Sequence, residues 1–267
     1  MLCMVSDEGS PSMNEPRGVL VSGAGPRMRS ILRDLALPTF QRYASRWGYS
    51  VDIADLPVDG VGADAPAQYA KWMKLKLLRA ALNVFPMAVW LDADVLIVRD
   101  DEDILTHLHP DHFQALALEH VPYEHRVNPN TGVWLIRSCP MAFAFLDAVE
   151  KAGPQPGPWA DQGAVLAALG WDRGDHSYCW SRPGRGNAFL ASTSWLPPGW
   201  NQPYLDGRCD HDLFNSSAVS YADRPTVAYP HALHFMGMTP AARYRHMSSV
   251  VDHPQTPAHG PPCSAGW

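Results

Sequence analysis

The sequence predicts an α/β fold, because short apolar runs typical of buried strands alternate with segments of helical periodicity. Gly18–Ser22 and Met87–Leu91 are two such runs, and residues 67–83 between them form the clearest amphipathic helix. The 267 residues suffice for one large or two small domains. We expect a loose arm at residues 1–17 and a loose Pro-rich tail at residues 252–267.

The composition excludes several classes of protein. The chain is 46% hydrophobic and 18% charged, which is typical of a globular protein, and its net charge of -6 argues against nucleic acid as a general partner. The first residues lack the apolar core of a signal peptide, and no apolar stretch is long enough to span a membrane. The 5 cysteines form no CxxC pair, so neither a zinc site nor a disulfide framework is expected. Scattered reduced thiols predict a cytoplasmic protein.

The first strand runs into a glycine turn, Gly23–Arg27, and open α/β sheets bind ligands at such carboxyl ends. A dinucleotide-binding turn would need a third glycine where the chain has Met28. Residues 29–47 predict a helix that Pro38 breaks or restarts and that Gly48 ends. Its inward stripe is expected to contain Phe40, Tyr43 and Trp47.

A second strand at Tyr49–Ile53 and a loop at residues 57–66 precede the amphipathic helix of residues 67–83. The apolar face of that helix is expected to contain Trp72, Leu75, Leu78 and Leu82. The helix is rich in cations for an acidic protein, namely Lys71, Lys74, Lys76 and Arg79. A solvated basic face is the simplest interpretation for most of these side chains.

The segment Trp90–Asp100 contains the strongest chemical signal. Asp92 and Asp94 follow an apolar strand at a spacing of two, and side chains two apart on a strand point to the same face. Burying two unpaired carboxylates would be costly, and a divalent cation would remove that cost. Oxygen ligands suit Mg²⁺ or Mn²⁺, which would in turn suit a phosphate-bearing ligand.

The middle of the chain predicts further elements. The acidic residues 100–103 are expected to begin a short helix, and Phe113–Leu118 to form a strand. Asn130, Thr131 and Gly132 are expected in a turn before the strand Val133–Ile136. Turn residues at the start of a strand would expose amide side chains to a ligand.

The last third contains two helices and an irregular region. Pro140–Lys151 predicts a helix whose inward residues are Met141, Phe145 and Val149, and residues 153–158 a linker. Trp159–Gln162 begins another helix, near whose N-terminus Asp161 could act as a cap. Residues 170–230 are rich in Trp, Pro and Gly and show little periodicity. Their aromatic rings could pack against the faces of a sugar or could simply belong to a core. His234 is a metal candidate only if the fold brings it to the aspartates.

Four segments in order along the chain resemble those of retaining glycosyltransferases with the GT-A fold: WLDADVLI, NTGVWLIR, ADQGAVL and HFMG. The chain looks most like the family of fungal and plant α-galactosyl, α-mannosyl and xyloglucan xylosyl transferases, and less like the glycogenin-like family. YASRWGYSVDI and WMKLKLLRAALNVFP extend the resemblance upstream, so that it covers roughly residues 18–240. It implies a central, mostly parallel sheet flanked by helices.

The resemblance also implies one domain at residues 18–251, with a donor half at about 18–138 and an acceptor half at about 139–251. Its implied ligands for Mn²⁺ or Mg²⁺ are Asp92, Asp94 and His234. The implied contacts to a UDP- or GDP-linked sugar donor are Ser22, Gly23, Lys74, Asp92, Ala93, Asn130, Thr131, Gly132 and Gly237. Asp161 and Gln162 would lie below the anomeric carbon, as in enzymes that retain its configuration.

The chain departs from these families in two respects. After HFMG the glycogenin-like family has Lys-Pro-Trp to hold the diphosphate; this chain has Met238-Thr-Pro, so that Arg243 or Arg245 is expected to take over that contact. Many members of the closest family carry a membrane anchor. The lack of one here predicts a soluble acceptor, which could be a small molecule, a glycan or a peptide.

Other interpretations stay open at this point. A haloacid-dehalogenase-like phosphatase also places DxD after an apolar strand, but expects Thr or Val where this chain has Leu96. The interpretation as a dinucleotide-binding oxidoreductase is supported only by the glycine turn, which lacks the third glycine. A noncatalytic sugar- or nucleotide-binding protein would be expected to lose metal ligands, and all three are present. Asp161 could also serve as the base of an inverting enzyme.

Overall fold

The computed structural model describes residues 15–57, 69–121, 126–155, 160–172, 182–184, 186–204 and 230–252. Its main sheet has 6 strands in the order β2-β1-β3-β6-β5-β9. Only β6 among them runs against the others, since it pairs antiparallel with both β3 and β5, whereas the remaining pairs are parallel. The strands are β1 (Gly18–Ala24), β2 (Tyr49–Asp55), β3 (Met87–Leu91), β5 (Gln114–Val121), β6 (Arg126–Arg137) and β9 (Thr193–Leu196). The prediction of a mostly parallel α/β sheet is confirmed.

A second sheet of 3 short strands has the order β10-β11-β4, where β10 is Gln202–Pro203, β11 is Ala232–His234 and β4 is Val95–Ile97. The chain passes from the main sheet to this small sheet between β3 and β4. Two further strands, β7 (Trp171–Asp172) and β8 (Arg182–Pro183), pair only with each other in the described part of the chain.

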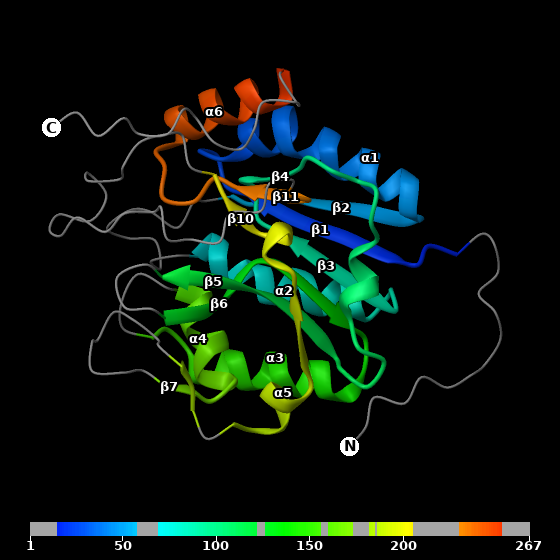
Figure 1. The fold of residues 1–267 in the computed structure, drawn as a ribbon, viewed down its shortest axis with the longest axis vertical. Coiled ribbons are helices and arrows are strands. Elements are labelled where there is room, and N and C mark those ends of the chain that lie inside the picture. Colours follow the sequence, from blue (N-terminus) through cyan, green and yellow to red (C-terminus); the bar gives the residue numbers. More distant parts are fainter. Residues whose placement is uncertain are drawn as a thin grey trace, which may run out of the picture.

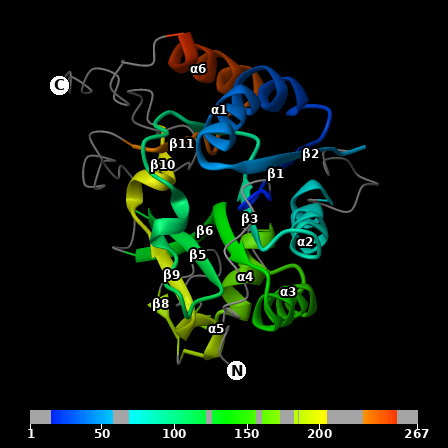
Figure 2. The same ribbon diagram turned by 90° about the vertical axis from the view of Figure 1, so that its right-hand side faces the viewer.

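Helices cover both faces of the main sheet (Figures 1 and 2). The π-helical segment η1 (Ile31–Ala36), α1 (Leu37–Trp47) and α6 (Pro240–Asp252) lie on one side. The helices α2 (Tyr69–Leu82), α3 (Pro140–Ala152) and α4 (Ala160–Ala168) lie on the other. The shorter helices are η2 (Ile104–His107), α5 (Ala188–Ala191) and η4 (Pro198–Trp200).

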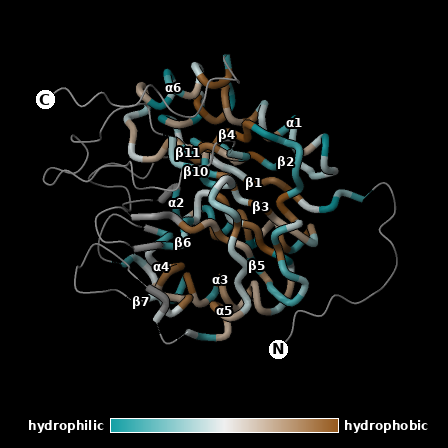
Figure 3. Tube along the Cα trace, in the orientation of Figure 1, coloured by the Kyte–Doolittle hydropathy of each residue, from teal (hydrophilic) through white to brown (hydrophobic). Residues whose placement is uncertain are grey.

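Alternate residues of the central strands pack into two separate hydrophobic cores, one on each face of the main sheet. Leu20 and Val89 pack with Phe40 of α1, whereas Val21 and Trp90 pack on the α2–α3–α4 side. Figure 3 shows hydrophobic residues running along these strands. A strand that is buried on both faces reads as a continuous apolar run, which is why β1 and β3 were recognisable in the sequence.

The predicted helices are present with small shifts. Pro38 lies in the first turn of α1, and Gly48 ends that helix at a φ of 75°, donating its N–H to the Ala44 carbonyl. Trp47 is only half-buried. On α2, Trp72 is half-buried while the rest of its predicted apolar face is buried, and the exposed cations include Lys71 and Lys76.

Three local predictions are wrong in detail. Gly23 belongs to β1 and not to a turn. Asp92 and Asp94 lie in the connection between β3 and β4, so they do not share a strand face. Asn130, Thr131 and Gly132 lie inside β6, where the pairing jumps from Leu116–Trp134 to Ala117–Asn130. The segment 131–133 is therefore a bulge, and bulges re-aim side chains next to functional sites.

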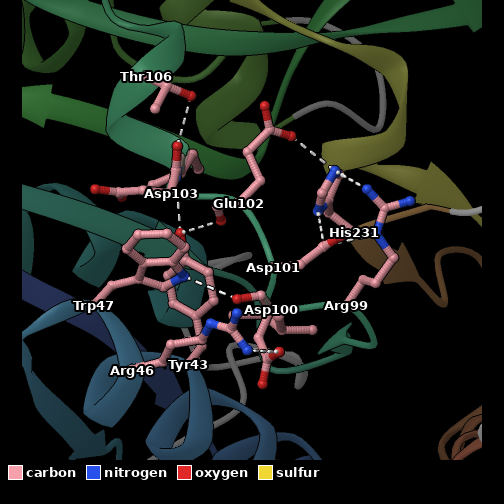
Figure 4. Close-up of polar contacts among 12 residues, drawn as sticks. Tyr43, Arg46, Trp47, Arg99, Asp100, Asp101, Glu102, Asp103, Thr106 and His231 are labelled. Atoms are coloured by element: carbon pink, nitrogen blue, oxygen red, sulfur yellow. Dashed lines mark hydrogen bonds and ion pairs between the residues drawn. The ribbon is translucent and has the colours of Figure 1, made fainter.

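The acidic run after β4 connects distant elements (Figure 4). Asp103 caps η2 by accepting from the Leu105 N–H, as expected for an acidic helix start. Trp47 donates its Nε1–H to the Asp100 carbonyl, and Glu102 lies 2.8 Å from Nε2 of His231. The run therefore joins α1 to the residue that precedes β11.

One expectation about the cysteines is wrong, because Cys139 is disulfide-bonded. The argument from reduced thiols to a cytoplasmic location therefore fails at this residue. Several predicted segments lie outside the described residues: the arm at 1–14, most of the loop at 57–66, residues 67–68, residues 156–159 of the linker and helix start, most of the irregular region 170–230, and the tail from 253. Among the helices that are described, none has the length and apolar character needed to cross a bilayer.

Candidate active site

Asp92, Asp94 and His234 form a possible metal-binding group at the junction of the two sheets. Each offers one ligand atom, and these atoms lie within 4.8 Å of one another. Nε2 of His234 is 3.4 Å from an Asp94 oxygen and 3.8 Å from an Asp92 oxygen. The antiparallel pairing of β11 with β4 produces this proximity, because it sets His234 opposite Val95. Two carboxylate oxygens and one imidazole nitrogen suit Mn²⁺ or Mg²⁺.

Lys74 is buried next to this group. Its Nζ lies 3.1 Å from Asp92 Oδ1 and 2.9 Å from Asp161 Oδ2, and it donates to the carbonyl and the hydroxyl of Thr131. Burial alone would lower the pKa of Lys74, but Asp161 and Asp92 outweigh it and raise the pKa. The ammonium group thus links α2 to β6, α4 and the β3–β4 connection.

Asp94 is held by a second cation. Nε of Arg243, from α6, lies 3.0 Å from Asp94 Oδ2 and also donates to the Phe235 carbonyl. Burial by itself raises the pKa of Asp94, but His234 and Arg243 outweigh it and hold the pKa at about 2. Of the two arginines considered from the sequence, Arg243 therefore lies in the site, whereas Arg245 is exposed.

The bulge in β6 forms one wall of the site. Gly132 donates its N–H to Asn130 Oδ1 and accepts from the Asp92 N–H at 2.8 Å. A Cβ atom at position 132 would come within 2.3 Å of the His234 ring, so only glycine fits there without displacing the histidine. Thr131 donates its hydroxyl to Asp161.

The remaining candidates have differing surroundings. Ser22 is completely buried and donates its hydroxyl to the Leu91 carbonyl, which ties the carboxyl ends of β1 and β3 together. Gln162 is buried, and its Nε2 has no hydrogen-bond partner among the described residues. Ala93 is buried between the two aspartates, and Gly237 is exposed with a φ of 71°.

Two contacts to the metal-binding group were not expected from the sequence. Trp90 donates its Nε1–H to Asp92 at 2.6 Å, and Oδ1 of Asn201 lies 2.9 Å from Nδ1 of His234. Trp90 stands two residues before the first aspartate, so a strand with period two could have suggested its direction. Asn201 has no such local signal, because only the parallel pairing of β10 with β11 brings it to His234.

The chain was also compared with known proteins. No protein-family model matches the chain. It is 32% identical over 114 residues to probable glycosyltransferase 7 of rice, Oryza sativa subsp. indica, a match to 40% of this chain and 26% of the relative. It is 34% identical over 107 residues to probable glycosyltransferase 6 of subsp. japonica, covering 38% of this chain. The chain thus matches only about a quarter of the length of these curated relatives.

Two solved structures share the fold over most of the chain. A glycosyltransferase involved in glycosylating the major capsid of PBCV-1 superposes with a TM-score of 0.54 at 15% identity, covering 87% of this chain and 98% of its own. The galactosyltransferase LgtC, in complex with donor and acceptor sugar analogs, superposes with a TM-score of 0.52 at 14% identity, covering 89% and 96%. The chain has the GT-A fold and is related in sequence to plant proteins named as probable glycosyltransferases.

Proposed function

We propose that this chain is a metal-dependent glycosyltransferase that transfers a sugar from a UDP- or GDP-linked donor to an acceptor and retains the anomeric configuration. The observation that carries the proposal is the group of Asp92, Asp94 and His234 at the carboxyl end of β3 in a GT-A fold. Open α/β sheets bind ligands at that edge.

The metal would be held by one oxygen from each aspartate and by Nε2 of His234. When bound, a divalent cation would offset the charge of the nucleotide diphosphate leaving group. A second positive group that could offset the charge of the diphosphate is the Arg243 guanidinium. Its Nε lies 3.0 Å from Asp94 Oδ2, next to the proposed metal position. An acidic chain that binds an anionic donor needs such local positive charge.

The surroundings of Asp161 support retention. An inverting enzyme needs a carboxylate placed to deprotonate the acceptor. Asp161 is buried and its Oδ2 contacts Lys74 and Thr131, which favours a structural role for this carboxylate over that of a base. Gln162 beside it cannot act as a base, but its carbonyl oxygen can stabilise positive charge that develops at the anomeric carbon.

Asn130, Thr131 and Gly132 would line the donor sugar, because they lie at the β6 bulge, where Thr131 bonds Lys74 and Gly132 lies against the His234 ring. We retain Ser22 and Gly23 as residues near the donor through their backbone, since the Ser22 hydroxyl is used within the protein. LgtC was solved with donor and acceptor sugar analogs, and by analogy we propose a sugar-bearing acceptor for this chain.

The GT-A fold rules out the haloacid-dehalogenase-like phosphatase and the dinucleotide oxidoreductase considered from the sequence. A noncatalytic binding protein with the same fold is the remaining alternative. A screen of UDP- and GDP-linked sugars with Mn²⁺, read by thermal shift and by donor hydrolysis, separates the two. We expect one donor both to stabilise the protein and to be hydrolysed to free sugar and nucleotide. Stabilisation without turnover would favour the binding protein, and no response to any donor would contradict the proposal.

A further inference from the structure

Asn201 lies behind the metal-binding group, on the opposite side of the His234 ring from the aspartates. Its Oδ1 is 2.9 Å from Nδ1 of His234, and both side chains are buried, at 5% and 4% exposure. The other ring nitrogen, Nε2, is the atom that faces Asp92 and Asp94. The Asn201 amide and the carboxylates of Asp92 and Asp94 thus face the two different ring nitrogens of His234.

The chemistry of this contact determines the form of the histidine. An amide oxygen can only accept a hydrogen bond, so the proton must sit on Nδ1 of His234. In the neutral ring the lone pair is then on Nε2, directed at the aspartates, which is the form that ligates a metal. Residues behind metal-bound histidines commonly act in this way, by fixing the tautomer and the orientation of the ring.

The backbone of Asn201 is itself firmly placed. The preceding residue, Trp200, is 1% exposed, and its ring stacks on His231 at 4.7 Å with an interplanar angle of 7°. His231 donates its backbone N–H to the Gly199 carbonyl, and Gln202, the next residue after Asn201, pairs with Leu233 of β11. His231 is in turn held by Glu102 and Arg99 (Figure 4). Two consecutive residues, Trp200 and Asn201, therefore hold the two histidines of the segment 231–234.

We propose that Asn201 is a positioning residue that sets the tautomer and ring orientation of His234 for metal binding. The inference rests on the proposed function only in requiring that Asp92, Asp94 and His234 bind a metal. It extends that function to a residue in the least periodic part of the sequence. Nothing in the role of Asn201 requires contact with the metal or with the donor.

The side chain of Asn201 permits a clean experiment. Nδ2 of Asn201 has no hydrogen-bond partner among the described residues. The substitution Asn201→Leu therefore tests the loss of the contact between Oδ1 and His234. Asn201→Asp keeps an acceptor at the same place. Gln114→Leu is the matched control, because it removes a fully buried amide that bonds Trp134 and Thr193 away from the metal-binding group.

The readout is the affinity for Mn²⁺ alone, measured from the electron paramagnetic resonance signal of free Mn²⁺. We expect Asn201→Leu to lower that affinity by about 10- to 100-fold, Asn201→Asp to restore it, and Gln114→Leu to leave it unchanged while lowering the melting temperature. Equal affinity in Asn201→Leu and wild type would overturn the inference and leave the proposed metal site intact. A wild-type protein that does not bind Mn²⁺ would overturn both.

A second measurement needs no variant at position 201. In the wild-type protein with diamagnetic Mg²⁺ and ¹⁵N-labelled histidine, the ring nitrogens report the tautomer of His234 directly. We expect the proton on Nδ1. A proton on Nε2 would overturn the inference, whether or not Asn201→Leu folds.

Discussion

Nζ of Lys74 lies 2.9 Å from Oδ2 of Asp161, and each of these two side chains is only 4% exposed. Lys74 also contacts Asp92, whose side chain is 31% exposed. Lys74 is thus the counter-charge of two carboxylates, of which that of Asp161 is buried and would be costly to bury alone. Lys74 thus differs from the exposed lysines of the same helix.

Replacing Lys74 by methionine would leave Asp92 and Asp161 without their cation. We expect Lys74→Met to lower the free energy of unfolding by about 3–5 kcal/mol, because unpaired charges in a protein interior are strongly destabilising. Lys76→Met, at an exposed position on the same helix, is the control and should change stability by less than about 0.5 kcal/mol. Urea denaturation measures both, and equal stability of the two variants would contradict the role given to Lys74.

The metal-binding group makes a direct prediction about cation affinity. Asp92→Asn, Asp94→Asn and His234→Gln should each weaken Mn²⁺ binding by on the order of 100-fold or more, beyond the effect expected for a supporting residue. Asp100→Asn is the control, since Asp100 pairs with Arg42 and Arg46 away from the site. Isothermal calorimetry with Mn²⁺ decides the matter. Wild-type affinity in the first three variants would exclude these residues as ligands.

The substitution Gly132→Ala should weaken metal binding through a steric clash with His234. The added Cβ would come within 2.3 Å of the His234 ring, so the ring must move away from the aspartates. We expect weaker Mn²⁺ binding than in wild type. Gly18→Ala introduces a comparable clash with Met87, 2.8 Å away, and serves as the control that lowers stability without changing Mn²⁺ affinity. Equal losses of affinity in the two variants would point to a general disturbance of the fold.

Gln162→Ala should lower turnover more than donor binding. If its carbonyl stabilises charge that develops only in the transition state, kcat should fall on the order of 100-fold while KM for the donor changes little. Gln155→Ala is the control, because Gln155 bonds only the carbonyls of Ala152 and Gly153 in the described part of the chain. A rise in KM with unchanged kcat would make Gln162 a simple binding residue.

The product should carry the anomeric configuration of the donor. The expectation follows from the pairing of Asp161 with Lys74, which favours a structural role for this carboxylate over that of a base. Proton NMR of the anomeric coupling constant, on product formed before mutarotation, gives the answer. An inverted product would contradict the retaining mechanism and would make Asp161 the candidate base.

Much of the fold was predictable because its signals are local. The apolar runs of β1 and β3, the period of α2 and the glycine that ends α1 each depend on residues close together in sequence. The same holds for the choice of Asp92 and Asp94, since two carboxylates inside an apolar run are conspicuous on their own. Their arrangement was predicted for the wrong reason, because the chain leaves the main sheet at this point.

The rest of the site depends on pairings between distant segments. His234 reaches the aspartates only through the pairing of β11 with β4, and Asn201 only through that of β10 with β11. The bulge at Thr131 and Gly132 depends on the register of β6 against β5, which a pattern of turn-forming residues cannot reveal. The disulfide of Cys139 was missed for a related reason, since spacing along the chain says little about proximity in space.

The passage from β3 to β4 has a mechanical consequence. Asp92 follows the last residue of a strand in the large sheet, while Asp94 precedes the first residue of a strand in the small one. A cation held by both, and by His234 of the small sheet, would tie the two sheets together. Local opening of these strands of two or three residues would pull the ligands apart. By linkage, a bound cation would oppose local unfolding of the small sheet, and the folded small sheet would oppose release of the cation, each by the same free energy.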